Sequence, residues 1–230
     1  MVPSDLLVFE YDGAVIRFWL PEFRTDFVQR IMMRNRCFWE RKVLEKVRCH
    51  FPEAGVFVDV GAFVGNHAVY FAKICGAKRV ICFEPQLHFA NVIAQNVALN
   101  SLEHIVDIYP NGLGDRVGHL AVTRSFAATA AMTSFDYDEG GLIKAETLDL
   151  YHLNQVDLLK IDVEGMESKV VEGAKETLLR TAPIVWLEAV SAEAKSKLSR
   201  CLSDLGYEFL EQVSEMDLLF SPGFKRVWHC

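Results

Sequence analysis

The stretch VFVDVGAFVGNHA, residues 56–68, decides the fold. Its first five residues are apolar apart from Asp59, a composition typical of a strand buried on both faces. Gly61 and Gly65 then permit a tight turn, and a helix is predicted over residues 66–75. In open α/β sheets ligands bind at such a junction, where backbone N–H groups and a helix N-terminus converge. The stretch therefore predicts a ligand-binding strand, turn and helix.

The chain beyond this stretch alternates short apolar strands with longer helical segments. Further strands are predicted at 79–83, 104–109, 156–162 and 183–188, helices at 87–99, 166–180 and 192–205, and a closing β region at 207–228. This alternation predicts βαβ units, and hence a doubly wound, mostly parallel α/β sheet with helices on both faces. Because such crossovers are right-handed, few topologies remain possible.

The N-terminal part does not follow this alternation. Residues 6–20 predict a β-hairpin that turns at Asp12 and Gly13, a strong two-residue turn signal. A helical pattern then runs over residues 26–47. We therefore expect residues 1–54 to form a hairpin-plus-helix cap.

The predicted main domain spans residues 55–230 and contains one irregular segment. Residues 110–147 are rich in small and polar side chains, with a strand expected at 119–124. A loop insertion of this length in a compact domain is commonly a lid or a binding loop, although a plain surface insertion is the alternative.

Composition restricts the partners that the protein can have. The formal net charge is −7, whereas a protein that docks on phosphate backbones usually presents a basic face, so nucleic acid is not expected as a substrate. No apolar run approaches the ~20 residues that cross a bilayer, and the N-terminus lacks a secretory signal pattern. We expect a soluble cytoplasmic protein.

The cysteines and histidines show no metal-binding pattern. The six cysteines form no C-x-x-C pair, and the seven histidines show no ligand spacing. We therefore expect reduced thiols, with neither a zinc site nor a disulfide framework.

The glycine turn discriminates among nucleotide cofactors. A dinucleotide fingerprint needs a glycine at the middle position of G-x-G-x-x-G, where this chain has Phe63. Asp59 would repel a pyrophosphate, whereas its carboxylate suits the α-ammonium group of S-adenosylmethionine. The chain also contains no G-x-x-x-x-G-K-[ST] loop. These residues favour S-adenosylmethionine as the cofactor and argue against a nicotinamide-dependent oxidoreductase.

A second cofactor contact is predicted at the tip of the next strand. Glu84 lies 23 residues after Gly61, and a carboxylate at about this distance can accept hydrogen bonds from both hydroxyls of a ribose. The alternative is a strand-end acid that faces water. From the turn and this strand tip, the predicted cofactor-binding residues are Asp59, Gly61, Ala62, Gly65, Asn66, Glu84 and Pro85.

Four motifs resemble those of the FkbM-type methyltransferases. They are DVGAFVG (59–65), FEP (83–85), QNVALNSL (95–102) and KIDVEGMESKVVEGA (160–174), and the resemblance extends over residues 38–219. It implies the Rossmann-like class I methyltransferase fold, with a seven-stranded sheet that ends in an antiparallel hairpin strand. It also implies S-adenosylmethionine as cofactor and, usually, a hydroxyl of a small molecule or sugar as acceptor.

The resemblance carries one departure and one further set of expected contacts. Where the family usually has asparagine, which tolerates left-handed backbone, this chain has Phe63, so we expect an altered pocket shape. In class I enzymes the residues after the third strand commonly border the adenine, which suggests Asn111, Gly112 and Leu113. A plain Asn-Gly turn is an equally good interpretation.

The DLLKIDVEG stretch supplies candidates for the reactive end. Methyl transfer to oxygen requires a group that aligns the acceptor and removes its proton. Asp162, at the end of the fourth main strand, is the predicted base or orienting group, with Glu164 assisting. For Glu164 and Glu167, stabilisation of a helix N-terminus is the structural alternative, and we favour it for Glu167.

Lys160 and Glu188 complete the predicted catalytic set. Lys160 lies inside an apolar strand, where an unpaired ammonium is costly, so it is expected to pair with Asp162 or Glu188. That pair could be purely structural. Asp162, Glu164 and Glu188 could also hold a divalent cation, although no metal is predicted.

The sequence leads to one main function and several alternatives. The main prediction is an O-methyltransferase that acts on a small molecule or a glycan. N-methylation and a non-catalytic S-adenosylmethionine-binding module are the alternatives. Trp39 and Glu40 could close over the cofactor, although a core role is favoured for an aromatic residue at helical spacing.

Overall fold

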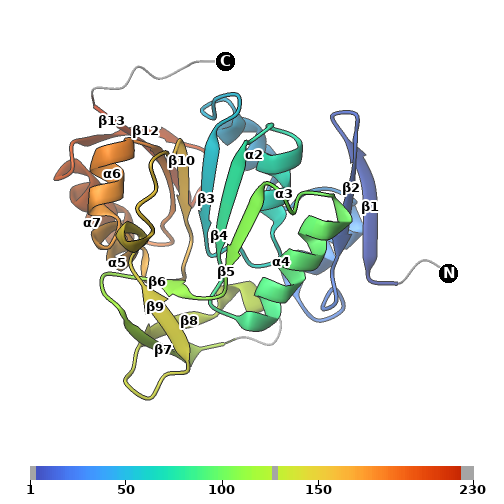
Figure 1. Cartoon of the computed structure of the whole chain (residues 1–230), viewed down its shortest axis with the longest axis horizontal. Coiled ribbons are helices and arrows are strands. Elements are labelled where there is room, and N and C mark those ends of the chain that lie inside the picture. The colour runs from blue at the N-terminus through green and yellow to red at the C-terminus, as the bar shows by residue number, and fades with distance from the viewer. Residues whose placement is uncertain (1–3, 126–128, 224–230) are drawn as a thin grey trace.

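The computed structural model describes residues 4–125 and 129–223, which form a mixed α/β fold (Figure 1). Its central sheet has seven strands in the order β12-β13-β11-β10-β3-β4-β5. These strands are β3 (Val56–Val60), β4 (Arg79–Phe83), β5 (Val106–Tyr109), β10 (Leu158–Ile161), β11 (Ile184–Glu188), β12 (Tyr207–Gln212) and β13 (Asp217–Pro222). From β5 to β11 neighbouring strands are parallel, whereas β13 is antiparallel to both β11 and β12. The sheet is therefore mixed, with a parallel part that contains the predicted first strand.

Helices lie on both sides of this sheet (Figure 1). The helices of the two sides are α3 (Asn66–Lys73) and α4 (Leu87–Leu99) on one, and α5 (Glu167–Glu172), α6 (Lys175–Thr181) and α7 (Ala192–Ser203) on the other. Every residue of β3 is buried, and its side chains alternate between two hydrophobic cores, Phe57 in one and Val58 in the other. The uninterrupted apolar run at 56–60 is thus explained by burial on both faces.

The N-terminal hairpin packs against the main domain through α4. It consists of β1 (Leu6–Tyr11) and β2 (Ala14–Trp19), and the predicted turn is confirmed because Asp12 and Gly13 both have positive φ. The Asn96 side chain accepts a hydrogen bond from the backbone N–H of Trp19 (2.6 Å), and the Asn100 side-chain amide donates to the carbonyl oxygen of Arg17 (2.7 Å).

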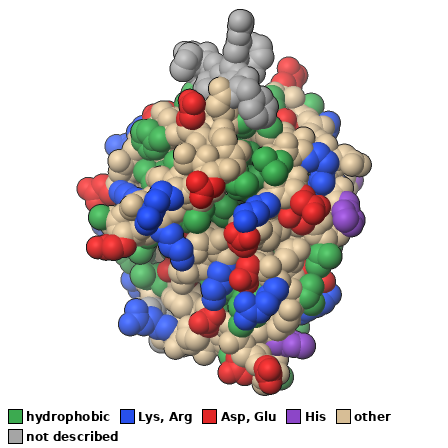
Figure 2. Space-filling view, turned by 90° about the vertical axis from the view of Figure 1, so that its left-hand side faces the viewer, with side chains coloured by type: hydrophobic (Ala, Val, Ile, Leu, Met, Phe, Trp, Pro, Cys, Tyr) green, Lys and Arg blue, Asp and Glu red, His purple; other side chains and the backbone are tan. Residues whose placement is uncertain are grey.

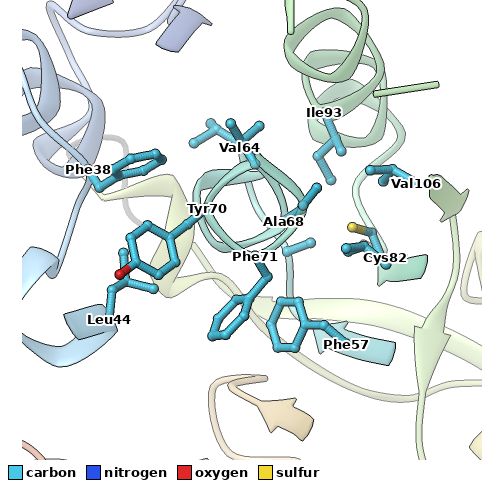
Figure 3. Packing of buried hydrophobic residues seen from close by; sticks show 14 of the residues in the cluster. Phe38, Leu44, Phe57, Val64, Ala68, Tyr70, Phe71, Cys82, Ile93 and Val106 are labelled. Carbon is cyan, nitrogen blue, oxygen red and sulfur yellow. The ribbon is translucent and has the colours of Figure 1, made fainter. Parts of the chain in front are cut away.

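Aromatic side chains fill the space between the hairpin and the sheet. Figure 3 shows Phe38, Tyr70, Phe71 and Phe57 in succession from the N-terminal part to β3. The ring centroids of Phe38 and Tyr70 are 5.1 Å apart, and those of Phe57 and Phe71 are 4.2 Å apart. One continuous core therefore joins the N-terminal residues to the sheet.

The helical pattern at 26–47 forms two helices, which corrects the expectation of one. They are α1 (Phe27–Asn35) and α2 (Arg41–Arg48), separated by left-handed backbone at Arg36 (φ 50°) and Glu40 (φ 54°). The Asn66 side chain holds the connection, because it accepts from the N–H of Trp39 (2.9 Å) and donates to its carbonyl oxygen (3.2 Å). This contact places Trp39 above the end of β3.

The segment at 110–147 forms a second sheet in the order β6-β9-β7-β8. Its strands are β6 (Gly112–Leu113), β7 (Gly118–Arg124), β8 (Ser134–Tyr137) and β9 (Ile143–Glu146), and the 3₁₀ helices η1 (Ala130–Met132) and η2 (Leu148–Tyr151) flank β8 and β9. The strand expected at 119–124 is confirmed by β7. β8 and β9 are short and half exposed, and β6 has only two residues, so their sequences carry little period-two signal.

The helix predicted at 166–180 divides into α5 and α6 at Gly173. At this point the chain passes so close to the β6 side of the molecule that a Cβ on Gly173 would lie 1.9 Å from the carbonyl oxygen of Gly114. Contact between the two backbones, rather than the φ of Gly173 (−79°), therefore requires glycine here.

Replacing Gly173 with alanine is expected to lower the free energy of unfolding by about 2–3 kcal/mol, because backbone must move to admit the methyl group. Urea denaturation measures the change. Gly140→Ala is the matched control, since a Cβ there meets only the side chain of Asp138, at 3.2 Å. Equal stability of the two variants would show that the contact at Gly173 relaxes without cost.

The described residues contain four free thiols and no membrane-spanning helix. No helix in the described ranges is both long enough and apolar enough to cross a bilayer. Cys37, Cys75, Cys82 and Cys201 are free thiols, as expected. The expectation of reduced cysteines does not extend to Cys49, which is not free.

Candidate active site

A cavity of about 350 Å³ lies beyond the carboxyl ends of the parallel strands. From the strand ends it is lined by Gly61, Glu84, Pro85, Asp162, Glu164 and Glu188. Parallel strands carry their carboxyl ends to one edge, and this explains why side chains that are distant in sequence meet here. Six of the predicted site residues thus share one cavity.

The turn after β3 has the strained backbone that the glycines permit. Gly61 (φ 87°), Phe63 (φ 50°) and Gly65 (φ 78°) are all left-handed, a conformation that costs a residue with a Cβ roughly 1–2 kcal/mol. Phe63 therefore keeps the backbone that asparagine would adopt easily. Its ring packs on Phe89, with centroids 4.5 Å apart, and lines the cavity. An aromatic ring thus forms part of the cavity wall at this position, and the altered pocket shape stays a prediction.

Glu84 is held rigidly at the tip of β4. It is 4% exposed, and its two carboxylate oxygens accept hydrogen bonds from the N–H groups of Phe63 and Gln86, both at 2.9 Å. Burial raises the pKa of Glu84 to about 7, although the two N–H donors oppose the shift. Each oxygen keeps a second lone pair, so the carboxylate remains able to accept from a diol in the cavity.

The residues predicted to border the adenine lie next to this cavity. Asn111, Gly112 and Leu113 line a hollow of about 20 Å³. That hollow and the larger cavity adjoin, because both are lined by Gly61 and Pro85. The hollow itself has room for little more than one water molecule, so a ligand group larger than that would enter it only if the lining moved.

Asp59 occupies a different place from the one predicted. Its side chain is fully buried and does not line the cavity. The alternation of β3 directs it toward the α3 side of the sheet, where it lies 3.8 Å from Lys160 Nζ. A direct contact between Asp59 and a bound ammonium group is therefore not supported.

Three further residues of the predicted cofactor set lie behind the cavity surface. Ala62 is 2% exposed, the side chain of Asn66 bonds to Trp39, and Gly65 packs against Ile93. None of the three lines the cavity. They shape the turn and hold the N-terminal residues over it.

Lys160 forms the ion pair that its position in an apolar strand predicts. Its Nζ lies 2.8 Å from Asp162 Oδ2, and its side chain is 3% exposed. Burial favours neutral lysine, but the charges of Asp162 and Asp59 outweigh it and hold the pKa of Lys160 above its ordinary value. The ammonium is therefore charged and does not line the cavity.

Three carboxyl groups meet at the cavity wall in different protonation states. One oxygen each of Asp162, Glu164 and Glu188 lies within 4.8 Å of the others. Burial opposes ionisation of Asp162, but Lys160 and a hydrogen bond with Glu188 hold its pKa below the ordinary value. Burial and the charge of Asp162 raise the pKa of Glu188 to about 9 and that of Glu164 to about 7. At neutral pH Asp162 is ionised and Glu188 carries a proton.

Glu167 has the structural role that we favoured. Its carboxylate accepts hydrogen bonds from the N–H groups of Val163 (3.2 Å) and Gly165 (3.0 Å). It therefore stabilises the turn in which Glu164 adopts left-handed backbone (φ 55°).

The cavity is also lined by two residues that the sequence suggested as covers and by several that it did not indicate. Trp39 and Glu40, named there as possible covers, both line the cavity. The apolar lining residues that no motif indicated are Phe27, Val28, Met132, Phe135, Val190 and Met216. They come from segments far apart in the sequence, and only the tertiary structure brings them together.

Comparison with known proteins identifies the family of this chain. The methyltransferase FkbM domain matches residues 59–220, so the chain belongs to the FkbM methyltransferase family. It is an enzyme, and S-adenosylmethionine is its cofactor.

Two sequence relatives are methyltransferases. The chain is 29% identical over 149 residues to the 2-O-methyltransferase NoeI of Sinorhizobium fredii, covering 55% of this chain and 60% of NoeI. It is 23% identical over 203 residues to the methyltransferase sdnD of Sordaria araneosa, covering 72% of this chain and 78% of sdnD. The chain thus spans less than two thirds of the length of NoeI.

Two crystal structures share the fold. The FkbM methyltransferase from Methylobacillus flagellatus has a TM-score of 0.55 at 14% identity, covering 73% of this chain and 43% of that one. The tRNA m1G37 methyltransferase of M. jannaschii has a TM-score of 0.53 at 14% identity, covering 95% of this chain and 55% of that one. At this identity the likeness concerns the fold alone.

Proposed function

We propose that the protein transfers the methyl group of S-adenosylmethionine to a hydroxyl oxygen of a small molecule or glycan. The observation that carries the proposal is the single cavity in which Glu84 adjoins the three carboxyl groups of Asp162, Glu164 and Glu188. The name of NoeI, a 2-O-methyltransferase, supports oxygen as the acceptor atom.

We propose that the cofactor contacts are divided between the cavity and its neighbouring hollow. We assign the ribose hydroxyls to Glu84 and the adenine to Asn111, Gly112 and Leu113. The methionine part would then lie along Gly61, toward the carboxyl groups. The bound cofactor supplies an electrophilic methyl carbon, and the chain supplies position, charge and a proton acceptor.

Glu164 is the better candidate for the base. A pKa of about 7 matches the pH at which a base must accept a proton, whereas the lowered pKa of Asp162 makes that carboxylate a weak base. Asp162, fixed by Lys160 and Glu188, orients the acceptor hydroxyl. Glu164 would accept the hydroxyl proton while the acceptor oxygen displaces the sulfonium sulfur from the methyl carbon, so that the C–S bond breaks as the C–O bond forms and S-adenosylhomocysteine is the leaving group.

We propose that the reaction does not depend on a divalent cation. Asp162, Glu164 and Glu188 are close enough to share an ion, but Lys160 already provides a cation at Asp162, and the proton on Glu188 removes one negative charge. Both reduce the attraction of the cluster for a metal.

The predicted fold class, domain bounds, location and substrate exclusion are also part of the proposal. We propose the class I, doubly wound arrangement, with residues 1–54 as cap, 55–230 as catalytic domain, and 110–147 as an insertion, supported by the strand order and by helices on both faces. We also propose a cytoplasmic location and no nucleic-acid substrate. On the face drawn in Figure 2, acidic and basic side chains are interspersed instead of separated by sign.

S-adenosylmethionine or S-adenosylhomocysteine should raise the melting temperature, and NAD and ATP should not. A ligand at 100 times its dissociation constant stabilises a protein by ~2.7 kcal/mol, which differential scanning fluorimetry detects easily. Equal stabilisation by NAD would contradict the proposed cofactor site.

Glu84→Ala is expected to weaken binding of S-adenosylhomocysteine about 10- to 150-fold, because a charge-assisted contact to the ribose is lost. Isothermal titration calorimetry measures the affinity, and circular dichroism checks the fold. Glu53→Ala, at an exposed acid outside the cavity, is the control. Unchanged affinity in Glu84→Ala would remove the ribose assignment.

A further inference from the structure

We infer that the acceptor is an uncharged molecule with an apolar body, a polycyclic or aromatic alcohol rather than a sugar or a phosphate ester. The inference rests on the proposed function, since it concerns the part of the same cavity that the cofactor leaves open. It is carried by the charge of the cavity wall and by the side chains around the opening.

The described residues that line the cavity include no Lys, Arg or His. Five carry carboxyl groups, namely Glu40, Glu84, Asp162, Glu164 and Glu188. The nearest buried ammonium, on Lys160, is already paired with Asp162 and Asp59. A phosphate or carboxylate on the acceptor would therefore be desolvated beside negative charge without a cationic partner.

Four apolar side chains of the cavity lining are also exposed, and we call the part of the cavity that they surround its opening. Phe27, Met132, Val190 and Met216 all line the cavity, and they are exposed by 41%, 47%, 69% and 41%. Large apolar side chains at this exposure, gathered around one opening, are typical of a ligand-binding surface. They come from α1, η1, the connection after β11 and the connection before β13, so no single element accounts for the group.

Aromatic side chains also line the cavity. Phe27 and Trp39 pack edge to face, with centroids 5.9 Å apart, and Phe135 of β8 lines the same cavity. A sugar has hydroxyls all round its ring, and those that face the apolar part of the lining would have no partner there, even though the carboxyl groups at the strand ends can accept from the others. An apolar ring system buries its surface against these side chains and needs a polar partner only at its reacting hydroxyl.

The test measures acceptor binding to the intact protein saturated with S-adenosylhomocysteine. The probes are a panel of naphthols and neutral polycyclic alcohols, the phosphate ester of each, and a panel of methyl glycosides. Saturation-transfer NMR and competition titrations give the affinities. We expect members of the neutral apolar panel to bind at least about tenfold more tightly than their phosphate esters and than the glycosides, since wrong partners are rejected by unpaired charge and unsatisfied polar groups.

A pair of variants separates the opening from the general surface. Val190→Lys should lower the affinity for the apolar probes about five- to tenfold, because it places a charge at the opening. The affinity for S-adenosylhomocysteine should not change. Leu179→Lys is the control, because Leu179 is 61% exposed but lies on α6, away from the cavity, and it should change neither affinity.

The outcomes distinguish this inference from the proposed function. Tighter binding of phosphate esters or glycosides, or no binding by any apolar probe to protein that binds S-adenosylhomocysteine, overturns the inference and leaves the cofactor site intact. Equal effects of Val190→Lys and Leu179→Lys also overturn it. Failure to bind S-adenosylhomocysteine would instead refute the proposed function itself.

Discussion

Lys160→Met is expected to lower the free energy of unfolding by about 3–5 kcal/mol, the usual cost of removing one partner from a buried ion pair. The ammonium of Lys160 lies 2.8 Å from Asp162 and 3.8 Å from Asp59, and it is 3% exposed. Without it, the fully buried carboxyl of Asp59 loses its ion-pair partner. Methionine matches the length of the lysine stem, so the loss is chiefly electrostatic. Urea denaturation at pH 7 measures it.

Two companion variants show whether burial is the cause. Lys169→Met removes an ion pair with Asp136 of similar length, 2.6 Å, but at the surface, so its effect should be below about 1 kcal/mol. In the second, Asp59→Leu is combined with Lys160→Met, and much of the loss should be recovered because no buried charge is stranded at that position. Equal losses in the two lysine variants would show that the buried pairing contributes little.

The position of Lys160 illustrates what sequence can predict about this site. In a strand, residues two apart share a face, and the parallel order brings strand ends to one edge. These two rules were enough to place Glu84, Asp162 and Glu188 together and to predict that Lys160 pairs with an acid. They depend only on local periodicity and on topology, both of which are readable from the chain.

Asp59 shows why charge alone was not enough. Its negative charge suits an ammonium group, but the side chain points to the face of β3 that α3 covers, and its neighbour in register is Lys160. Which face a core carboxylate occupies depends on the packing of both sides of the sheet. The prediction of one helix over 26–47 was wrong for a similar reason. The helix is interrupted at Glu40, next to Trp39, whose backbone is held by the distant side chain of Asn66.

The apolar opening could not be predicted from the sequence. Phe27, Met132, Val190 and Met216 each lie in a segment whose local pattern indicates only a helix, a loop or a turn. Their common role depends on tertiary placement alone. The proposed cofactor-binding part of the site is thus readable from motifs, whereas the proposed acceptor-binding part depends on the arrangement of elements.

Glu164→Gln is expected to reduce turnover by ~10²–10⁴-fold, the usual contribution of a positioned base. The amide keeps the size of the side chain but cannot accept the proton of the acceptor hydroxyl. In the parent enzyme the base must be ionised, so kcat/KM should rise with pH through about 7 and fall as Glu164 becomes protonated below it. This limb of the pH profile should be absent in the variant. The measurement follows identification of an acceptor.

The matched control is Glu167→Gln, which retains an oxygen that can accept from the N–H groups of Val163 and Gly165. It should leave turnover and the pH profile close to those of the parent. Affinity for S-adenosylhomocysteine should be preserved in both variants, because the ribose contact is assigned to Glu84. If Glu164→Gln retains parental turnover while Asp162→Asn loses it, the base is Asp162 despite its lowered pKa, and the hydrogen bond with Glu188 must then change when the acceptor binds.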